Sequence, residues 1–134
     1  MDILKILKLE NISEESKDLI EKEFKVIKFS IGQPISFDDN INKDILFIVD
    51  GEARLLDKKD NNNITIAKLG NGSIIGLASL LSRSPCEKIS ASKETIAIKI
   101  SDTVIIELYK KEIIFRNYCN KTLFPAEVLR VAKN

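Results

Sequence analysis

Short apolar segments recur roughly every 8–12 residues between about residues 25 and 100, and glycine, asparagine or aspartate separates them. Residues 45–49 form the clearest segment, because five apolar residues in a row are typical of a strand covered on both faces. Asp50-Gly51 marks a tight turn, and residues 53–56 continue as the partner strand. Closely spaced hairpins of this kind favour a barrel or a roll. The expected fold is therefore mainly β, a barrel or roll of roughly eight short strands.

Helical patterns lie on both sides of the predicted strands, and one short helical turn interrupts them near residues 77–81. Ser13 is the expected N-cap of an N-terminal helix, and Ser16 occupies the position where a capping box usually has glutamate. Val104 and Leu108 have the spacing of a buried helical stripe after the strands. The 134 residues suffice for one domain. We expect flanking α-helices over about 1–24, the β-roll over about 25–100 and C-terminal helices over about 101–134, in a single domain over 1–134.

Composition excludes several classes of function. The chain contains no histidine, which removes most zinc sites and every catalytic mechanism that needs an imidazole. Asp38, Asp39 and Asp44 could hold a hard cation, but they lack ordered ligand spacing. The formal net charge of +1, with lysines and carboxylates interspersed, predicts a solvated surface and gives no case for nucleic acid or a membrane as partner. Without an export signal the expected location is cytoplasmic, where Cys86 and Cys119 would stay free thiols.

Three stretches of the chain match a known family in the right order and spacing. They are Ile31-Gly32-Gln33-Pro34-Ile35, Phe47-Ile48-Val49-Asp50-Gly51-Glu52-Ala53 and Leu69-Gly70-Asn71-Gly72-Ser73-Ile74-Ile75-Gly76-Leu77-Ala78-Ser79-Leu80-Leu81. The chain resembles, from about Ile12 to Phe115, the cyclic-nucleotide-binding domain of catabolite-activator-type regulators and of cyclic-nucleotide-regulated kinases and channels. The resemblance implies a β-roll of the double-stranded β-helix or jelly-roll type, with flanking α-helices. It also implies that the third stretch begins a phosphate-binding cassette.

The cassette departs from the family pattern at both of its key side chains. Family members pair the phosphate with an arginine and the ribose hydroxyl with a glutamate directly after the last glycine. Here Leu77 stands in place of the glutamate, and the arginine is expected near Pro85-Cys86, where neither residue is basic. Free backbone N–H groups at the start of the short helix could still hold an anion weakly. The candidate ligand-binding residues are Ile75, Gly76, Leu77, Ala78, Pro85, Cys86 and Glu87.

The missing arginine predicts weak binding of cyclic AMP and cyclic GMP, or none. Removing the cation that pairs with a buried anion costs about 3–5 kcal/mol, which lowers affinity by at least about two powers of ten. Arg83 and Lys88 are nearby basic residues that could compensate, and their alternative interpretation is that of exposed loop residues. No cofactor is therefore assigned, and a cyclic nucleotide is disfavoured as the ligand.

Two functions stay open at this point. The first is a non-enzymatic regulatory or sensor domain for a small anionic or apolar ligand, part of or truncated from a larger protein. Activators of the family carry a DNA-reading helix-turn-helix after this domain, and the chain stops at Lys133-Asn134 with no room for one. The alternative is a ligand-free interaction module, which could form a homodimer through its C-terminal helices. An enzyme like the metal-dependent cupins, which are related jelly rolls, is disfavoured because cupins usually bind their metal with histidines.

Overall fold

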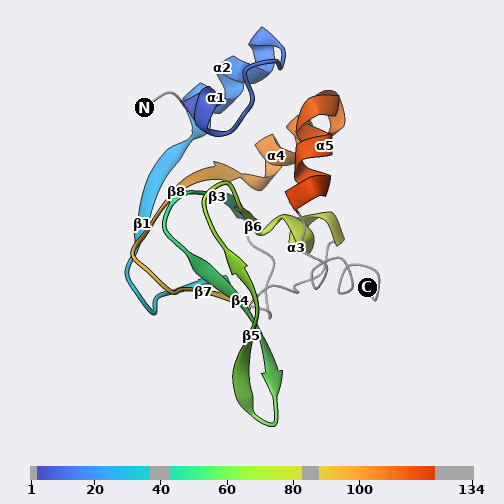
Figure 1. Cartoon of the computed structure of the whole chain (residues 1–134). Helices are drawn as coiled ribbons and strands as arrows, with labels where there is room; N and C mark the ends of the chain where they lie inside the picture. Colours follow the sequence, from blue (N-terminus) through green and yellow to red (C-terminus); the bar gives the residue numbers. More distant parts are fainter. Residues whose placement is uncertain (1–2, 37–42, 83–87, 123–134) are drawn as a thin grey trace.

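Eight strands and five helices form the described part of the chain in a computed structural model, which describes residues 3–36, 43–82 and 88–122 (Figure 1). The elements are, in chain order, α1 (Ile3–Ile6), α2 (Glu14–Glu23), β1 (Lys25–Phe29), β2 (Pro34–Ser36), β3 (Asp44–Asp50), β4 (Ala53–Lys59), β5 (Asn62–Leu69), β6 (Ile74–Ile75), α3 (Leu77–Ser82), β7 (Lys88–Ala91), β8 (Thr95–Ser101), α4 (Asp102–Lys111) and α5 (Ile113–Thr122). The predicted order of helices, strands with one inserted helix, and helices is confirmed.

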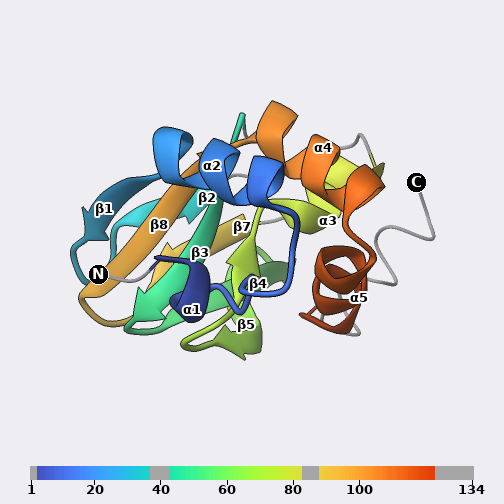
Figure 2. The same ribbon diagram turned by 90° about the horizontal axis from the view of Figure 1, so that it is seen from above.

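The strands form two antiparallel four-stranded sheets. One has the order β1-β8-β3-β6, and the other has the order β2-β7-β4-β5. In the first sheet β8 pairs with both β1 and β3, so that Ile98 lies opposite Val26 on one side and Phe47 on the other. The helices gather on one side of the roll and the β4–β5 hairpin projects from the opposite side (Figure 1). Figure 2 shows α2 and α4 side by side over the first sheet.

Two apolar cores share strand β3, whose side chains alternate between them. Leu46 and Ile48 point between the two sheets, whereas Ile45 and Phe47 point toward the helices. This explains the continuous apolar run, and it confirms that the strand is covered on both faces. The roll core between the sheets consists of Phe29, Leu46, Ile48, Ala53, Leu55, Leu69, Ile75, Ile89, Ala91 and Ala97. The helical core includes Ile20, Ile45, Phe47, Leu77, Ile98, Val104, Leu108, Phe115 and Cys119.

The β4–β5 hairpin is longer than the sequence indicated. The polar residues 57–63 suggest an exposed loop, but the strand pairing extends to Lys59 and Asn62 and leaves a turn of two residues. Asp60 and Asn61 have φ angles of 53° and 66°, the left-handed conformation that a tight hairpin turn requires and that Asp and Asn tolerate. The loop prediction was wrong in extent because backbone pairing needs no apolar side chain.

The N-cap of α2 is completed by a residue from the far end of the chain. Ser13 caps α2 as predicted, and its Oγ accepts a hydrogen bond from the Ser16 backbone N–H at 3.3 Å. The Glu112 carboxylate accepts hydrogen bonds from the Ser13 N–H at 3.2 Å, the Ser13 Oγ at 3.0 Å and the Ser16 Oγ at 2.9 Å. Glu112 lies between α4 and α5, so it supplies the carboxylate that the capping box lacks and ties α2 to the junction of the C-terminal helices.

Replacing Glu112 with alanine is expected to lower the free energy of unfolding by about 1 kcal/mol, because three donors lose their acceptor at a partly solvated site. The Ser16 hydroxyl and the Ser13 donors hold the pKa of Glu112 below its ordinary value of 4.5. This stabilisation is therefore complete above pH 4.5 and is lost as the pH falls through the lowered pKa. Urea titrations between neutral and acidic pH would measure it. Glu112→Gln should flatten the acid dependence, and exposed Glu23→Gln should not.

Candidate functional site

A glycine turn leads into the region that the resemblance identifies as the cassette. Gly72 and Gly76 have φ angles of 89° and 97°, which side chains rarely adopt and which glycine adopts without strain. The Gly72 N–H donates to the Ile48 carbonyl at 2.8 Å, and the Asn71 Oδ1 accepts from the Gly51 N–H at 3.1 Å. The turn before β6 is thereby fixed against the turn between β3 and β4.

Helix α3 starts directly after Gly76, whose carbonyl accepts a hydrogen bond from the Leu80 N–H at 3.0 Å. The four candidate residues that the structure describes here are all buried, and Leu77 and Ala78 are each 1% exposed. Leu77 packs in the helical core, and Ile75 packs in the roll core. At the position where the family has its ribose-binding glutamate, this chain therefore has a core side chain that contacts apolar neighbours.

The candidate basic residues are placed only in part. Arg83, Pro85, Cys86 and Glu87 lie outside the described residues. Lys88 is the first residue of β7, and its Nζ donates to the Asn63 Oδ1 on β5 at 3.0 Å. The next residue, Ile89, packs between the sheets. Because neighbouring side chains on a strand point to opposite faces, the Lys88 ammonium lies on the outer face of this sheet, away from the roll interior.

The roll core between the two sheets consists of aliphatic side chains and Phe29, and it contains no charged residue among those described. Three polar side chains on the strands and α3 are buried, namely Ser36 on β2, Ser79 on α3 and Thr95 on β8. The Thr95 hydroxyl lies within 3.2 Å of the Glu52 carbonyl and 3.0 Å of the Lys93 carbonyl. A ligand between the sheets would therefore meet apolar side chains, and no cation from the described part of the chain would face it.

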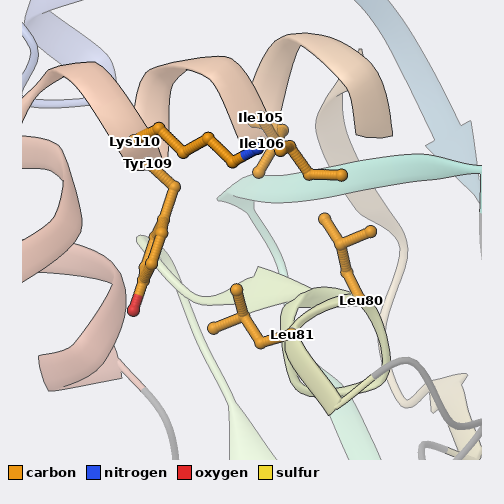
Figure 3. A pocket seen from close by; sticks show the side chains of 6 residues that line it. All are labelled: Leu80, Leu81, Ile105, Ile106, Tyr109 and Lys110. Atoms are coloured by element: carbon orange, nitrogen blue, oxygen red, sulfur yellow. The ribbon is translucent and has the colours of Figure 1, made fainter.

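An apolar groove of about 160 Å³ runs between α3 and α4 (Figure 3). Leu80 and Leu81 of α3 face Ile105, Ile106 and Tyr109 of α4, and the aliphatic stem of Lys110 lies along its edge. The sequence pattern predicted the buried stripe of this helix and did not identify the groove. The groove lies between α3 and α4, outside the roll core.

Helix α5 contacts the glycine turn through Tyr118 and the helical core through Phe115 and Cys119. The Tyr118 hydroxyl donates to the Gly72 carbonyl at 2.8 Å, and burial raises the pKa of this hydroxyl. Phe115 and Cys119 are fully buried in the helical core. Burial also raises the pKa of the Cys119 thiol to about 12, so this thiol stays protonated and unreactive at neutral pH.

The described residues include no cluster of metal ligands and no helix that could cross a membrane. They contain no group of three or more Cys, Asp or Glu side chains that could hold a metal ion. Asp44 lies 3.9 Å from the Lys99 Nζ, and Asp38 and Asp39 are outside the described ranges. Over the same ranges, no helix is long and apolar enough to cross a bilayer.

No family model matches the sequence, and no curated protein matches it. Solved structures do match. The catabolite activator protein of Thermus thermophilus has a TM-score of 0.69 and 21% identity, over 95% of this chain and 60% of that chain. A Trypanosoma brucei regulatory subunit of a cAMP-independent protein kinase A, in a mutant bound to cAMP, has a TM-score of 0.77 and 14% identity, over 97% of this chain and 48% of that one. The Trypanosoma cruzi regulatory subunit bound to guanosine has a TM-score of 0.77 and 16% identity, over 98% and 48%.

These matches confirm the fold that the resemblance predicted. The chain has the double-layered β-roll with flanking helices of cyclic-nucleotide-binding domains. It covers 60% or less of the length of the three named neighbours, each of which is called an activator or a regulatory subunit.

Proposed function

We propose that this chain is a non-enzymatic regulatory domain whose cassette binds cyclic AMP and cyclic GMP weakly or not at all. The observation that carries the proposal is the burial of Leu77 in the helical core, at the position of the family's ribose-binding glutamate. The second key side chain is also absent, since neither Pro85 nor Cys86 is basic. A phosphodiester held by backbone N–H groups alone would lack the bidentate charge pair that an arginine provides.

We propose that the ligand is small, and that it is either a neutral compound or an anion bound with low affinity. A neutral nucleoside or an apolar ring compound needs no arginine, because neither carries a phosphate. Two findings on the trypanosomal subunits support this assignment. The Trypanosoma cruzi subunit is bound to guanosine, and the cAMP-bound Trypanosoma brucei subunit is a mutant in which one change introduces an arginine. The domain would act in the cytoplasm as part of a larger protein, in keeping with its covering 60% or less of these neighbours.

Calorimetric titration tests the proposal. Cyclic AMP and cyclic GMP are expected to give no saturable heat up to about millimolar concentration, the range in which binding energies fall to about 4 kcal/mol. Guanosine is expected to bind more tightly than either. Micromolar binding of a cyclic nucleotide by the unaltered chain would contradict the proposal.

Introducing the missing cation provides a gain-of-function test. Cys86→Arg is expected to raise the affinity for cyclic AMP by about two powers of ten, because a paired guanidinium offsets the desolvation of the phosphate. Ser84→Arg adds the same charge two residues away and is the matched control. An equal gain in both variants would show a general charge effect, and no gain in Cys86→Arg would count against the cassette assignment.

A ligand-free interaction module is the second candidate function. The groove between α3 and α4 favours it, together with Ile113 and Ile114 at the start of α5, which are 67% and 49% exposed. A homodimer through the C-terminal helices would cover this surface. Light scattering over a concentration series distinguishes the two candidates, because a dimer should appear at micromolar concentration and should be lost in Ile113→Ser/Ile114→Ser.

A further inference from the structure

The outer face of the sheet β2-β7-β4-β5 carries a row of cations. On β4 the side chains of Ala53 and Leu55 point into the roll core, so Arg54 and Lys58 point outward. On β7, Lys88 points outward next to inward-facing Ile89. On β5, Lys68 precedes inward-facing Leu69 and lies on the same outer face. We call these four residues the basic face: Arg54, Lys58, Lys68 and Lys88.

The register of the strands makes this row continuous. Arg54 lies directly opposite Lys68 across the β4–β5 ladder. Leu56 lies opposite Lys88 across the β4–β7 ladder, which places Lys88 on the diagonal from both Arg54 and Lys58. Opposite residues on one face have Cβ atoms about 5 Å apart and diagonal ones about 7–8 Å. Each cation of the row therefore has another cation as its neighbour.

Such a row opposes folding unless something compensates it, because like charges directly opposite each other repel. Glu52 is the carboxylate at its margin, with its Oε1 3.9 Å from the Arg54 Nε. Glu52 also accepts a hydrogen bond from the Ser92 hydroxyl at 2.7 Å, and this bond, with Lys93, Lys68 and Arg54 nearby, lowers its pKa. Lys58 and Lys68 form no salt bridge within the described part of the chain. The Asp57 side chain lies on the other face of the ribbon.

We propose that the basic face is a docking surface for an extended acidic segment of a partner protein. Charge complementarity selects the partner, since among the described residues four cations share this face with one marginal carboxylate, and that carboxylate is already engaged by Ser92 and Arg54. Strand β5 is an edge of its sheet, so its outer backbone groups can pair with an added strand. An added strand with carboxylates on alternate residues would present them every ~7 Å, on the side of the cations.

The composition of the face disfavours the other polyanions. No aromatic side chain lies on it among the described residues, so it lacks the platforms on which single-stranded bases stack. None of the exposed large apolar residues of the described chain lies there either, since Ile64 on β5 points to the opposite face. Insertion into a bilayer therefore has no anchor on this surface.

Fluorescence anisotropy with a labelled peptide of about ten alternating Glu and Ser residues tests the proposal, at an ionic strength of about 20 mM where screening is weak. The peptide is expected to bind, and added salt should release it. The variant Arg54→Gln/Lys58→Gln/Lys68→Gln/Lys88→Gln should weaken binding by at least about tenfold. The matched control Lys8→Gln/Lys22→Gln/Lys25→Gln/Lys121→Gln removes four exposed charges elsewhere and should change binding by less than about twofold.

Melting temperatures show whether a variant binds the peptide less tightly because its cations are removed or because it no longer folds. Because the substitutions relieve repulsion between Arg54 and Lys68, the face variant should melt at or above the temperature of the unaltered chain. If the face variant melts at a lower temperature than the unaltered chain, the single variant Lys68→Gln provides the test instead. Its expected loss in peptide affinity is about threefold. Equal losses in the face and control variants, or no peptide binding, would overturn the proposal. Tighter face-dependent binding of oligothymidylate or of phosphatidylserine vesicles would also overturn it, by assigning the face to nucleic acid or a membrane.

Discussion

Replacing Gly51 with alanine is expected to lower the free energy of unfolding by about 3 kcal/mol or more. Gly51 has a φ of 130°, and a Cβ there would lie 2.5 Å from the Thr95 Oγ1, 2.7 Å from the Glu94 carbonyl oxygen and 2.7 Å from the Thr95 Cα. A left-handed backbone with a side chain costs about 1–3 kcal/mol, and overpacking costs about as much again. The backbone around Thr95 cannot retreat easily, because β8 is paired on both sides.

Substitutions at two other glycines separate the cost of the backbone conformation from the cost of overpacking. Gly32→Ala introduces a side chain at a φ of 83° with nothing within 4 Å, so it should show the conformational cost alone, about 1 kcal/mol. Gly70→Ala meets neither a neighbour nor a positive φ, and it should change stability by less than about 0.5 kcal/mol. Urea denaturation of the three variants measures the series. Equal losses of stability in Gly51→Ala and Gly32→Ala would contradict the close approach of Gly51 to Glu94 and Thr95.

Phe115→Ala is expected to destabilise the chain by about 3–5 kcal/mol, the usual cost of removing a large side chain from a packed core. Phe115 is fully buried in the helical core, although α5 follows the roll in sequence and lies at its side (Figure 1). A domain of this size has about 5–15 kcal/mol in total, so the variant should be close to unfolding at 37 °C. Thermal melts followed by circular dichroism would measure the change.

The neighbouring residue provides the control for Phe115. Ile114 precedes it on α5 and is 49% exposed, so Ile114→Ala should lower stability by less than about 1 kcal/mol. A loss of under about 1 kcal/mol in Phe115→Ala would mean that α5 is an appendage that the roll does not need.

The strand pattern could be predicted from the sequence because the residues that form it are close together in the chain. The apolar run of β3 and the tight turn at Asp50-Gly51 are local signals, and the structure confirms both. The extent of the β4–β5 hairpin could not be predicted, because its tip is held by backbone pairing between polar residues. The capping of Ser13 by Glu112 joins residues 99 positions apart, and no local pattern reports such a contact.

The candidate site was predictable in its backbone and much less in its side chains. The short helical turn near residues 77–81 was predicted, and α3 begins there, directly after Gly76 with its positive φ. The sequence placed Leu77 at the cassette, and packing directs it into the helical core. The interspersed lysines predicted a merely solvated surface. Only the register of β4, β5 and β7 brings Arg54, Lys68 and Lys88 onto one face.

Strand β3 gives the molecule a single unfolding unit. Its odd-numbered side chains, Ile45 and Phe47, are covered by the helices, and its even-numbered ones, Leu46 and Ile48, are covered by the other sheet. A partly open form that kept the two sheets together and released the helices would expose Ile45 and Phe47 to water. Separation of the second sheet would instead expose Leu46 and Ile48. Neither half is therefore a stable resting state, and amide protons on β3 should exchange with solvent only when the whole domain opens.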